Sequence, residues 1–397
     1  MGNMFTYLNW RGDLSFKQDS FNEVDNLIFA QLVYVRFEEL VGIDWGSGIT
    51  IEEATRKFIK LKKIVKAKVL DNKEKDCKED RPEGIEIPNE ISLIERSMKL
   101  LYQMAKTARY KDLLLTDFKA TFDEALVEQF AAITIHINQK QLVISFRGTD
   151  DSLLGWKEDF NMLFMEHVPA QVSAANYTME TFLFYRKQMI LTGHSKGGNL
   201  AIYAGAFGIS KFGKKLKAVY NNDGPGFSKK MINTTSYQKL LPQVITIVPE
   251  SSIVGMFLEH QEDYFIVQSK QTGRMQHDAT SWEILGNQFI HLTDTSKVSK
   301  KWDTTISSWL EAMSKEQLKV AVDALFTVLM ATEAETRTGL SKEFVKKIPT
   351  MFKAMKELDA DMRENLTKTV IAFWKESNKT IRTTKKNETN KKSIVQK

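Results

Sequence analysis

The stretch Met189–Ala204, which reads MILTGHSKGGNLAIYA, decides the fold. An apolar run precedes the pentapeptide Gly193-His-Ser-Lys-Gly197, and a helix-compatible run follows it. A G-x-S-x-G sequence between a strand and a helix is typical of a nucleophile elbow, a turn so tight that it needs small residues two positions before and after the serine. Such a turn exposes the serine at the carboxyl edge of a sheet, beside the positive end of a helix. We therefore predict that Ser195 is a nucleophile, the alternative being an ordinary glycine-rich turn.

Further β-rich runs lie on both sides of this turn. Two of them, Ala131–Ile137 and Leu142–Phe146, are separated by four polar residues and predict an antiparallel hairpin. The others are Gln188–Thr192, Lys217–Tyr220, Val244–Val248 and Tyr264–Gln268. Each of these is separated from the next by enough residues for a crossover connection, so we predict a mostly parallel sheet covered by helices on both faces.

Helical periodicity dominates the two ends of the chain. The predicted helices cover Phe21–Leu40, Ile51–Val65, Glu90–Thr107, Glu316–Thr332, Lys342–Met355 (with a kink or break at Pro349) and Leu358–Glu376. A charged, proline-containing linker is predicted at Leu70–Asn89. We divide the chain into an N-terminal helical region (1–110), a core that contains the sheet (111–298), a C-terminal helical appendage (299–377) and a disordered basic tail (378–397).

The composition and the charge distribution exclude several classes of protein. The chain has 397 residues, of which 42% are hydrophobic and 27% charged, which is too polar for an integral membrane protein. The net charge of +6 lies entirely in the last twenty residues, so the rest of the chain has no excess positive charge with which to bind nucleic acid. We expect the tail to be solvated; the alternative is a peripheral contact with an anionic membrane.

The single cysteine, Cys77, excludes an intrachain disulfide, and no histidine or second cysteine near it offers a metal site. The segment Met1–Asp13 lacks the pattern of a signal peptide, and no segment approaches the ~18 consecutive apolar residues of a membrane span. We expect a protein of the reducing cytoplasm whose chemistry uses no metal and no cofactor.

A serine nucleophile needs a histidine base, which follows the serine in chains with this kind of turn. Three histidines come after Ser195. His277 lies in a loop after the last long β-rich run, where the base belongs, and we predict that it is the base. His260 falls in a predicted helix, Ile253–His260, and His291 lies in a run of alternating apolar residues, so both are predicted to be structural.

The carboxylate that orients the histidine must lie at the carboxyl end of a strand to reach the imidazole. Two acidic residues between the serine and His277 satisfy this condition, Asp223 and Glu250. We favour Asp223, although an Asp-Gly pair also forms tight turns. Glu250 remains the alternative.

Acyl transfer at a serine also needs N–H donors for the developing oxyanion. The backbone N–H of Lys196, directly after the serine, supplies one. The second is predicted in the loop Ser145–Asp150, where Gly148 allows a close approach and Thr149 offers both an N–H and a hydroxyl. The apolar segment Leu153–Tyr185 that follows lines an acyl pocket or belongs to the core.

These motifs resemble those of the lipase-type α/β-hydrolases. Phe146-Arg-Gly-Thr149, followed by Trp156 and Asp159, is similar to the F-R-G-[ST]…W…D segment of fungal-type triacylglycerol lipases. Gly193-His-Ser-Lys-Gly197 is similar to their G-H-S-L-G, with a lysine at position 196. The resemblance implies an α/β-hydrolase fold and places Thr149 in the oxyanion hole.

The acid of the fungal-type lipases is missing here, because the corresponding stretch is Ser251-Ser-Ile-Val-Gly255. The segment Asn222–Gly226 is instead similar to the pancreatic-lipase arrangement, in which the acid follows the preceding strand, and this favours Asp223. The opening Asn9–Phe16 (NWRGDLSF), with Phe21–Leu27 and Gln276–Asp278, further resembles a bacterial lipase-like family of unassigned function over roughly Met1 to Leu310.

The residues and the resemblance together lead to two hypotheses. The first is a serine hydrolase that cleaves a carboxylic ester or thioester of a small molecule or lipid through an acyl-serine intermediate. The second is an inactive hydrolase scaffold whose helical ends bind a protein or a membrane. The missing acid after the later strand and the unusual Lys196 favour the second.

Overall fold

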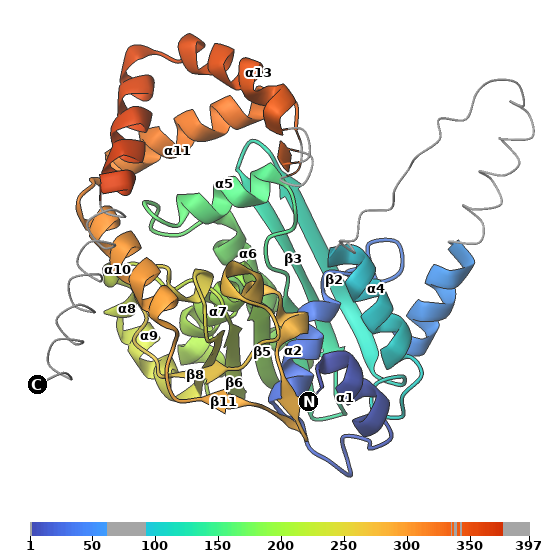
Figure 1. Ribbon diagram of the computed structural model, residues 1–397. Coiled ribbons are helices and arrows are strands. Elements are labelled where there is room, and N and C mark those ends of the chain that lie inside the picture. Colours follow the sequence, from blue (N-terminus) through green and yellow to red (C-terminus); the bar gives the residue numbers. More distant parts are fainter. Residues whose placement is uncertain (1, 62–92, 335, 337–339, 342–343, 376–397) are drawn as a thin grey trace, which may run out of the picture.

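The computed structural model describes residues 2–61, 93–334, 336, 340–341 and 344–375 (Figure 1). Its main sheet has the strand order β1-β2-β3-β4-β5-β6-β7-β8-β11. The bounds are β1 Gly48–Thr50, β2 Leu114–Asp123, β3 Glu128–His136, β4 Gln141–Phe146, β5 Gln188–His194, β6 Leu216–Asn222, β7 Val244–Pro249, β8 Tyr264–Val267 and β11 His291–Leu292. A short antiparallel pair is formed by β9 (Ile284–Leu285) and β10 (Gln288–Phe289). The strands β4 to β8 run parallel to one another, so the sheet has the predicted α/β architecture.

An antiparallel edge extends this parallel core. The predicted hairpin is confirmed, because β3 pairs with β4 in antiparallel register. Strand β2, which pairs with β3, was not predicted. Its register shifts between Thr116 and Lys119, and Asp117 in the bulge has φ +54°. A bulge changes the face on which each following side chain lies, so the alternation of apolar and polar residues loses its phase within the strand.

Helices cover both faces of the sheet (Figure 1). One apolar cluster joins α1 (Met4–Arg11), α2 (Glu23–Leu32) and α4 (Leu93–Met104) to side chains such as Val143 of β4. The opposite cluster joins α6 (Pro169–Tyr185), α7 (Lys196–Phe212) and α9 (Thr235–Leu240) to the alternate side chains of the same strands. The sheet is therefore the middle layer of three, which is why its central strands are apolar on both faces.

Two helix predictions need correction. The helix predicted over Phe21–Leu40 spans only Glu23–Leu32, where the Asn22 capping box starts it and the β-branched residues Val33 and Val35 follow its end. The break predicted at Pro349 is absent, since α13 (Phe344–Glu357) continues through that residue. Pro349 has no N–H to donate to the Val345 carbonyl, so α13 continues with one hydrogen bond fewer.

The C-terminal helices form a group that contacts α5 (Leu153–Asn161) mainly through α11 (Lys315–Met330). They are α10 (Lys297–Glu311), α11 (Lys315–Met330), α13 and the helix at residues 360–375, and the last three share a small apolar cluster around Ala324 and Leu358. Figure 1 shows α11 between α5 and α13 at the top of the molecule. Phe160 of α5 packs edge-on against Phe326 of α11, with ring centroids 5.8 Å apart.

Two sequence predictions fall outside the described residues. These are the charged linker at Leu70–Asn89, which contains Cys77, and the basic tail at residues 378–397. Within the part that the structure does describe, no helix is both long enough and apolar enough to cross a membrane.

A buried ion pair ties the N-terminal segment to the start of β2. Asp25 of α2 and Arg109 are both fully buried, and Arg109 Nε donates to Asp25 Oδ1 at 2.8 Å, while a second guanidinium nitrogen binds Oδ2. The same guanidinium donates to the backbone carbonyls of Leu14, Asp19 and Ser20 at 2.9–3.1 Å. One side chain therefore holds both α2 and the loop before it.

We expect Arg109→Met to lower the free energy of unfolding by about 3–5 kcal/mol, because it leaves the Asp25 carboxylate buried without its partner. Urea denaturation of the full-length protein measures this. The matched control is Arg11→Met, which breaks the partly exposed pair with Asp19 and should change the stability little. A similar small change in both variants would contradict the structural role of Arg109.

Candidate active site

Ser195 lies in the turn between β5 and α7, as the pentapeptide predicts. Its backbone has φ +57° and ψ −132°, a strained conformation for a residue with a side chain. A Cβ on Gly193 would lie 2.1 Å from the backbone of Gly197, and a Cβ on Gly197 would lie 2.2 Å from the carbonyl oxygen of Phe146. The two glycines therefore allow β5, α7 and the end of β4 to approach closely enough to hold the serine in this conformation.

Ser195, His277 and Asp223 form one chain of hydrogen bonds. His277 Nε2 lies 3.0 Å from Ser195 Oγ, and His277 Nδ1 lies 2.7 Å from Asp223 Oδ2. Because a carboxylate only accepts, Nδ1 carries the proton and Nε2 is left to accept one from the serine. Asp223 is fully buried directly after β6, whereas the His277 side chain is 31% exposed and can reach a substrate.

The structure brings Asp223, and not Glu250, to His277. Glu250 follows β7, and its backbone bonds with Val267 and Ser296. Among the hydrogen bonds of the described residues, none joins the Glu250 side chain to the imidazole. The other oxygen of Asp223 accepts bonds from the Ser252 hydroxyl and, at 3.2 Å, from the Gly255 N–H.

Ser252 was not predicted as a site residue, although the sequence contains a signal for it. It lies in the Ser251–Gly255 stretch, where the lipase resemblance places an acid. Instead of supplying an acid, this stretch donates hydrogen bonds from Ser252 and Gly255 to the carboxylate of Asp223, which follows β6.

The two other late histidines lie apart from this chain. The helix predicted over Ile253–His260 is wrong: Phe257 and Glu259 pair as extended backbone with Gly226 and Phe227, which leaves only a short 3-10 turn at Val254–Met256. The His260 ring lies 3.0 Å from a Glu262 oxygen. His291 of β11 lies 3.1 Å from a Glu23 oxygen.

The loop after β4 lies against Ser195. A Cβ on Gly148 would lie 2.3 Å from the Tyr34 hydroxyl and 3.2 Å from Ser195 Cβ, so only glycine fits there. Tyr34 was not predicted as part of the site. Burial raises the pKa of Tyr34, so its hydroxyl stays protonated against this loop.

Thr149 comes next in this loop, and its hydroxyl donates to the Asp159 carboxylate at 2.7–2.8 Å. Burial raises the pKa of Asp159 to about 6, and the positive charge of Lys196 and the Thr149 hydroxyl oppose that shift. Lys196 follows Ser195 as the first residue of α7, so the predicted oxyanion residues stand on two neighbouring loops at the carboxyl edge of the sheet.

A set of contacts holds the loop that carries His277. His194 Nε2 donates to the carbonyl oxygen of His277 at 2.9 Å, and the two rings lie 4.7 Å apart. Burial lowers the pKa of His194 well below its usual value, so this ring is neutral. Trp282 donates its indole N–H to the Gln276 carbonyl at 2.9 Å, and Asp278 forms an ion pair with Arg96 of α4.

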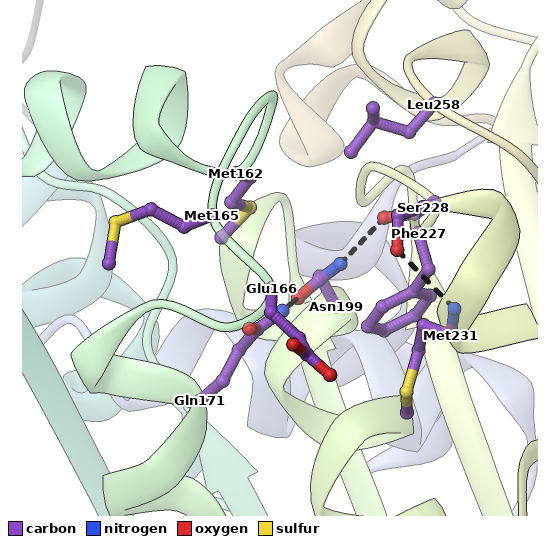
Figure 2. Close-up of a pocket in the computed structure, with 10 residues that line it drawn as sticks. Met162, Met165, Glu166, Gln171, Asn199, Phe227, Ser228, Met231 and Leu258 are labelled. Carbon is purple, nitrogen blue, oxygen red and sulfur yellow. Dashed lines mark hydrogen bonds between the residues drawn. The ribbon is translucent and has the colours of Figure 1, made fainter. Parts of the chain in front are cut away.

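A small hollow opens beside the first turn of α7 (Figure 2). Its walls are Met162, Met165, Glu166, Gln171, Asn199, Gly226, Phe227, Ser228, Met231 and Leu258. It leaves about 10 Å³ for the centre of a water molecule, room for about one water. The predicted acyl-pocket segment thus supplies two methionines to this hollow, while its residues Leu153 and Leu154 are buried in the core.

Among the residues that the structure describes, no group of three or more histidine, cysteine, aspartate or glutamate side chains could hold a metal ion. At the carboxyl edge of the sheet, the structure brings together the Ser195 hydroxyl, the His277 imidazole and the Asp223 carboxylate.

Comparison with known proteins gives one family model and several solved structures. A family model described as Mbeg1-like matches residues 104–327, more than half of the chain. No curated protein matches the sequence. Among solved structures, Rhizomucor miehei lipase in its native propeptide complex matches with a TM-score of 0.30 and 17% identity, over 40% of this chain and 57% of that one.

Two further lipase structures match to a similar extent. Lipase II from Rhizopus niveus has a TM-score of 0.32 and 18% identity, over 42% of this chain and 69% of that one. The lipase from Rhizopus microsporus var. chinensis has a TM-score of 0.29 and 19% identity, over 42% of this chain and 64% of that one. The chain thus spans little more than half of the Rhizomucor enzyme's length and about two thirds of the other two.

The tight turn makes a prediction that does not depend on activity. We expect Gly193→Ala to lower the free energy of unfolding by about 1–3 kcal/mol or more, because its Cβ meets backbone at 2.1 Å. The control is Gly42→Ala, where a Cβ meets nothing within 4 Å. Equal urea midpoints for the two variants would refute the close approach of β5 and α7.

Proposed function

We propose that this chain, which belongs to the Mbeg1-like family, is a serine hydrolase that cleaves a carboxylic ester or thioester through an acyl-serine intermediate. One observation carries the proposal: Ser195, on a strained strand-to-helix turn, bonds to His277, which bonds to the buried Asp223, at 3.0 and 2.7 Å. Nucleophile, base and orienting acid are recognised by this geometry and not by their spacing in the sequence.

In the proposed reaction, Ser195 Oγ attacks the carbonyl carbon of the substrate while His277 Nε2 takes the hydroxyl proton. The carbonyl oxygen becomes an oxyanion, held by the backbone N–H groups of Thr149 and Lys196. The bond to the leaving alcohol or thiol then breaks, and the leaving group takes the proton from His277. Water repeats the sequence on the acyl-serine, which releases the acid and restores the serine. Asp223 keeps the proton on Nδ1 and stabilises the imidazolium.

Two sequence features favoured an inactive scaffold, and the structure offers an account of each. The fungal-type lipases have their acid after the strand that corresponds to β7. Here Asp223 after β6 takes that role, and Ser252 and Gly255 of the stretch after β7 donate hydrogen bonds to its carboxylate. The unusual Lys196 is 1% exposed, and its ammonium group is bonded in the core. Neither feature removes a part that the reaction needs.

We expect a fluorophosphonate probe to label the full-length protein and not Ser195→Ala, because the probe needs the activated hydroxyl. Hydrolysis of p-nitrophenyl esters of graded acyl length should fall by about 10⁴- to 10⁶-fold in the same variant. Circular dichroism and the unfolding midpoint, which should match those of the unmodified protein, serve as controls. Labelling of the variant at the original rate would refute the mechanism.

A second pair of variants distinguishes the two acids. Asp223→Asn should lower kcat by about 10⁴-fold, because the amide favours the wrong tautomer of His277. Glu250→Gln should have a minor effect, since the structure joins its side chain to no part of this chain of bonds. Steady-state kinetics on one ester decide the matter, and the reverse pattern would assign the orienting role to Glu250.

A further inference from the structure

Both residues proposed as oxyanion donors are bonded through their side chains to consecutive acidic residues of α5. The Thr149 hydroxyl donates to Asp159 at 2.7–2.8 Å. Lys196 Nζ lies 2.7 Å from Glu158 Oε2. Thr149 follows β4 and Lys196 follows β5, so one helix binds both loops whose N–H groups must face the same oxygen atom.

Lys196 carries a fully paired charge in the core. Its side chain is 1% exposed, and Nζ donates to Glu158 Oε2, to the Gln129 carbonyl at 2.8 Å and to Gln129 Oε1 at 3.3 Å. An ammonium group has three donors, and all three are used. A long side chain held at its far end by three hydrogen bonds loses its rotamer freedom, which restrains the backbone to which it is attached.

Glu158 is equally well bonded. Its side chain is fully buried, Oε2 also accepts the Gln129 N–H at 3.0 Å, and Oε1 accepts the Ala170 N–H at 2.9 Å. Ala170 lies in the first turn of α6, where a negative charge is favourable. This carboxylate therefore joins β3, α5, α6 and α7 at a single point.

A side chain at position 196 is not needed for oxyanion binding, because the backbone N–H supplies the bond. A buried lysine must nevertheless be desolvated, and a buried pair often stabilises a fold no better than apolar residues of similar size. What the pair does provide is a fixed geometry, and a displacement of about 1 Å in an active site lowers the rate by about 10²-fold.

We propose that Glu158 is a positioning residue, which fixes the Lys196 N–H in the oxyanion hole through its ion pair with the Lys196 side chain. This inference rests on the proposed function and adds to it the residue that aligns one of the two donors, the N–H of Lys196.

The test compares four variants of the full-length protein: Glu158→Gln, Lys196→Met, the double variant with both changes, and Lys157→Met as the control. Lys157 is the neighbour of Glu158 on α5, and its ammonium group pairs with Asp323 of α11 at 3.3 Å on the more exposed side. Asp323 keeps a second partner, Lys319, at 2.8 Å when Lys157 is lost. The control therefore perturbs α5 without touching the oxyanion loops.

Three quantities are measured for each variant: kcat and KM on one p-nitrophenyl ester, the inhibition constant of a trifluoromethyl ketone, and the midpoint of thermal unfolding. The ketone adds to the serine and forms an oxyanion, whereas KM reflects mainly the bound ester. We expect Glu158→Gln to lower kcat by about 10- to 100-fold and to weaken ketone inhibition by a similar factor, with KM within about 2-fold.

The double variant separates positioning from stability. It removes both charges of the Glu158–Lys196 pair, so its unfolding midpoint should stay closer to that of the unmodified protein than the midpoint of Glu158→Gln. Its kcat and ketone affinity should still be about 10-fold lower or more, while Lys157→Met should match the unmodified protein in all three quantities.

A double variant that keeps the original kcat and ketone affinity would overturn the positioning role and leave the proposed hydrolase intact. An equal loss in Lys157→Met would also overturn it, because the effect would then belong to α5 as a whole. If the unmodified protein does not react with the fluorophosphonate probe, the proposed function fails, and the positioning role fails with it.

Discussion

Ser195 keeps its strained backbone only because three segments approach more closely than any Cβ allows. Gly193 and Gly197 remove the side chains that would separate β5, α7 and the end of β4. Gly148 likewise has no side chain to separate the loop after β4 from Ser195. The carboxyl edge of the parallel sheet can then bring the histidine and the aspartate into one chain of hydrogen bonds with the Ser195 hydroxyl, because parallel strands end at the same edge.

Buried polar side chains hold the loops around this edge. Asp223 is bonded by Ser252 and Gly255, and Lys196 is bonded by Glu158. Each buried charge has partners on other elements, so the loops cannot move independently without leaving a polar group unpaired in a low-dielectric interior. Loops held in this way would supply the pre-organised N–H donors that the proposed reaction needs.

The N-terminal helices belong to this arrangement, although they lie outside the segment that the family model matches. Tyr34 packs against the loop at Gly148, and Asn26 of α2 donates to Asn222, the residue before Asp223, at 2.9 Å. Arg96 of α4 pairs with Asp278, the residue after His277. The helices thus cover one face of the sheet and also support the loops of the site.

Local sequence determined the features that depend on local physics. The strand-turn-helix at Ser195, the hairpin of β3 and β4 and the apolar strands β5 to β8 follow from glycine spacing and hydrophobic runs. His277 and Asp223 could be predicted because chain order and strand ends restrict where a base and an acid can lie. Only the tertiary structure decided between Asp223 and Glu250 as the partner of His277, and it corrected the helix at Ile253–His260 and revealed β2. Those features depend on hydrogen bonds between segments far apart in the chain. The same holds for Glu158, whose carboxylate pairs with a lysine 38 positions away, because nothing in the sequence around either residue encodes which buried charge it will meet.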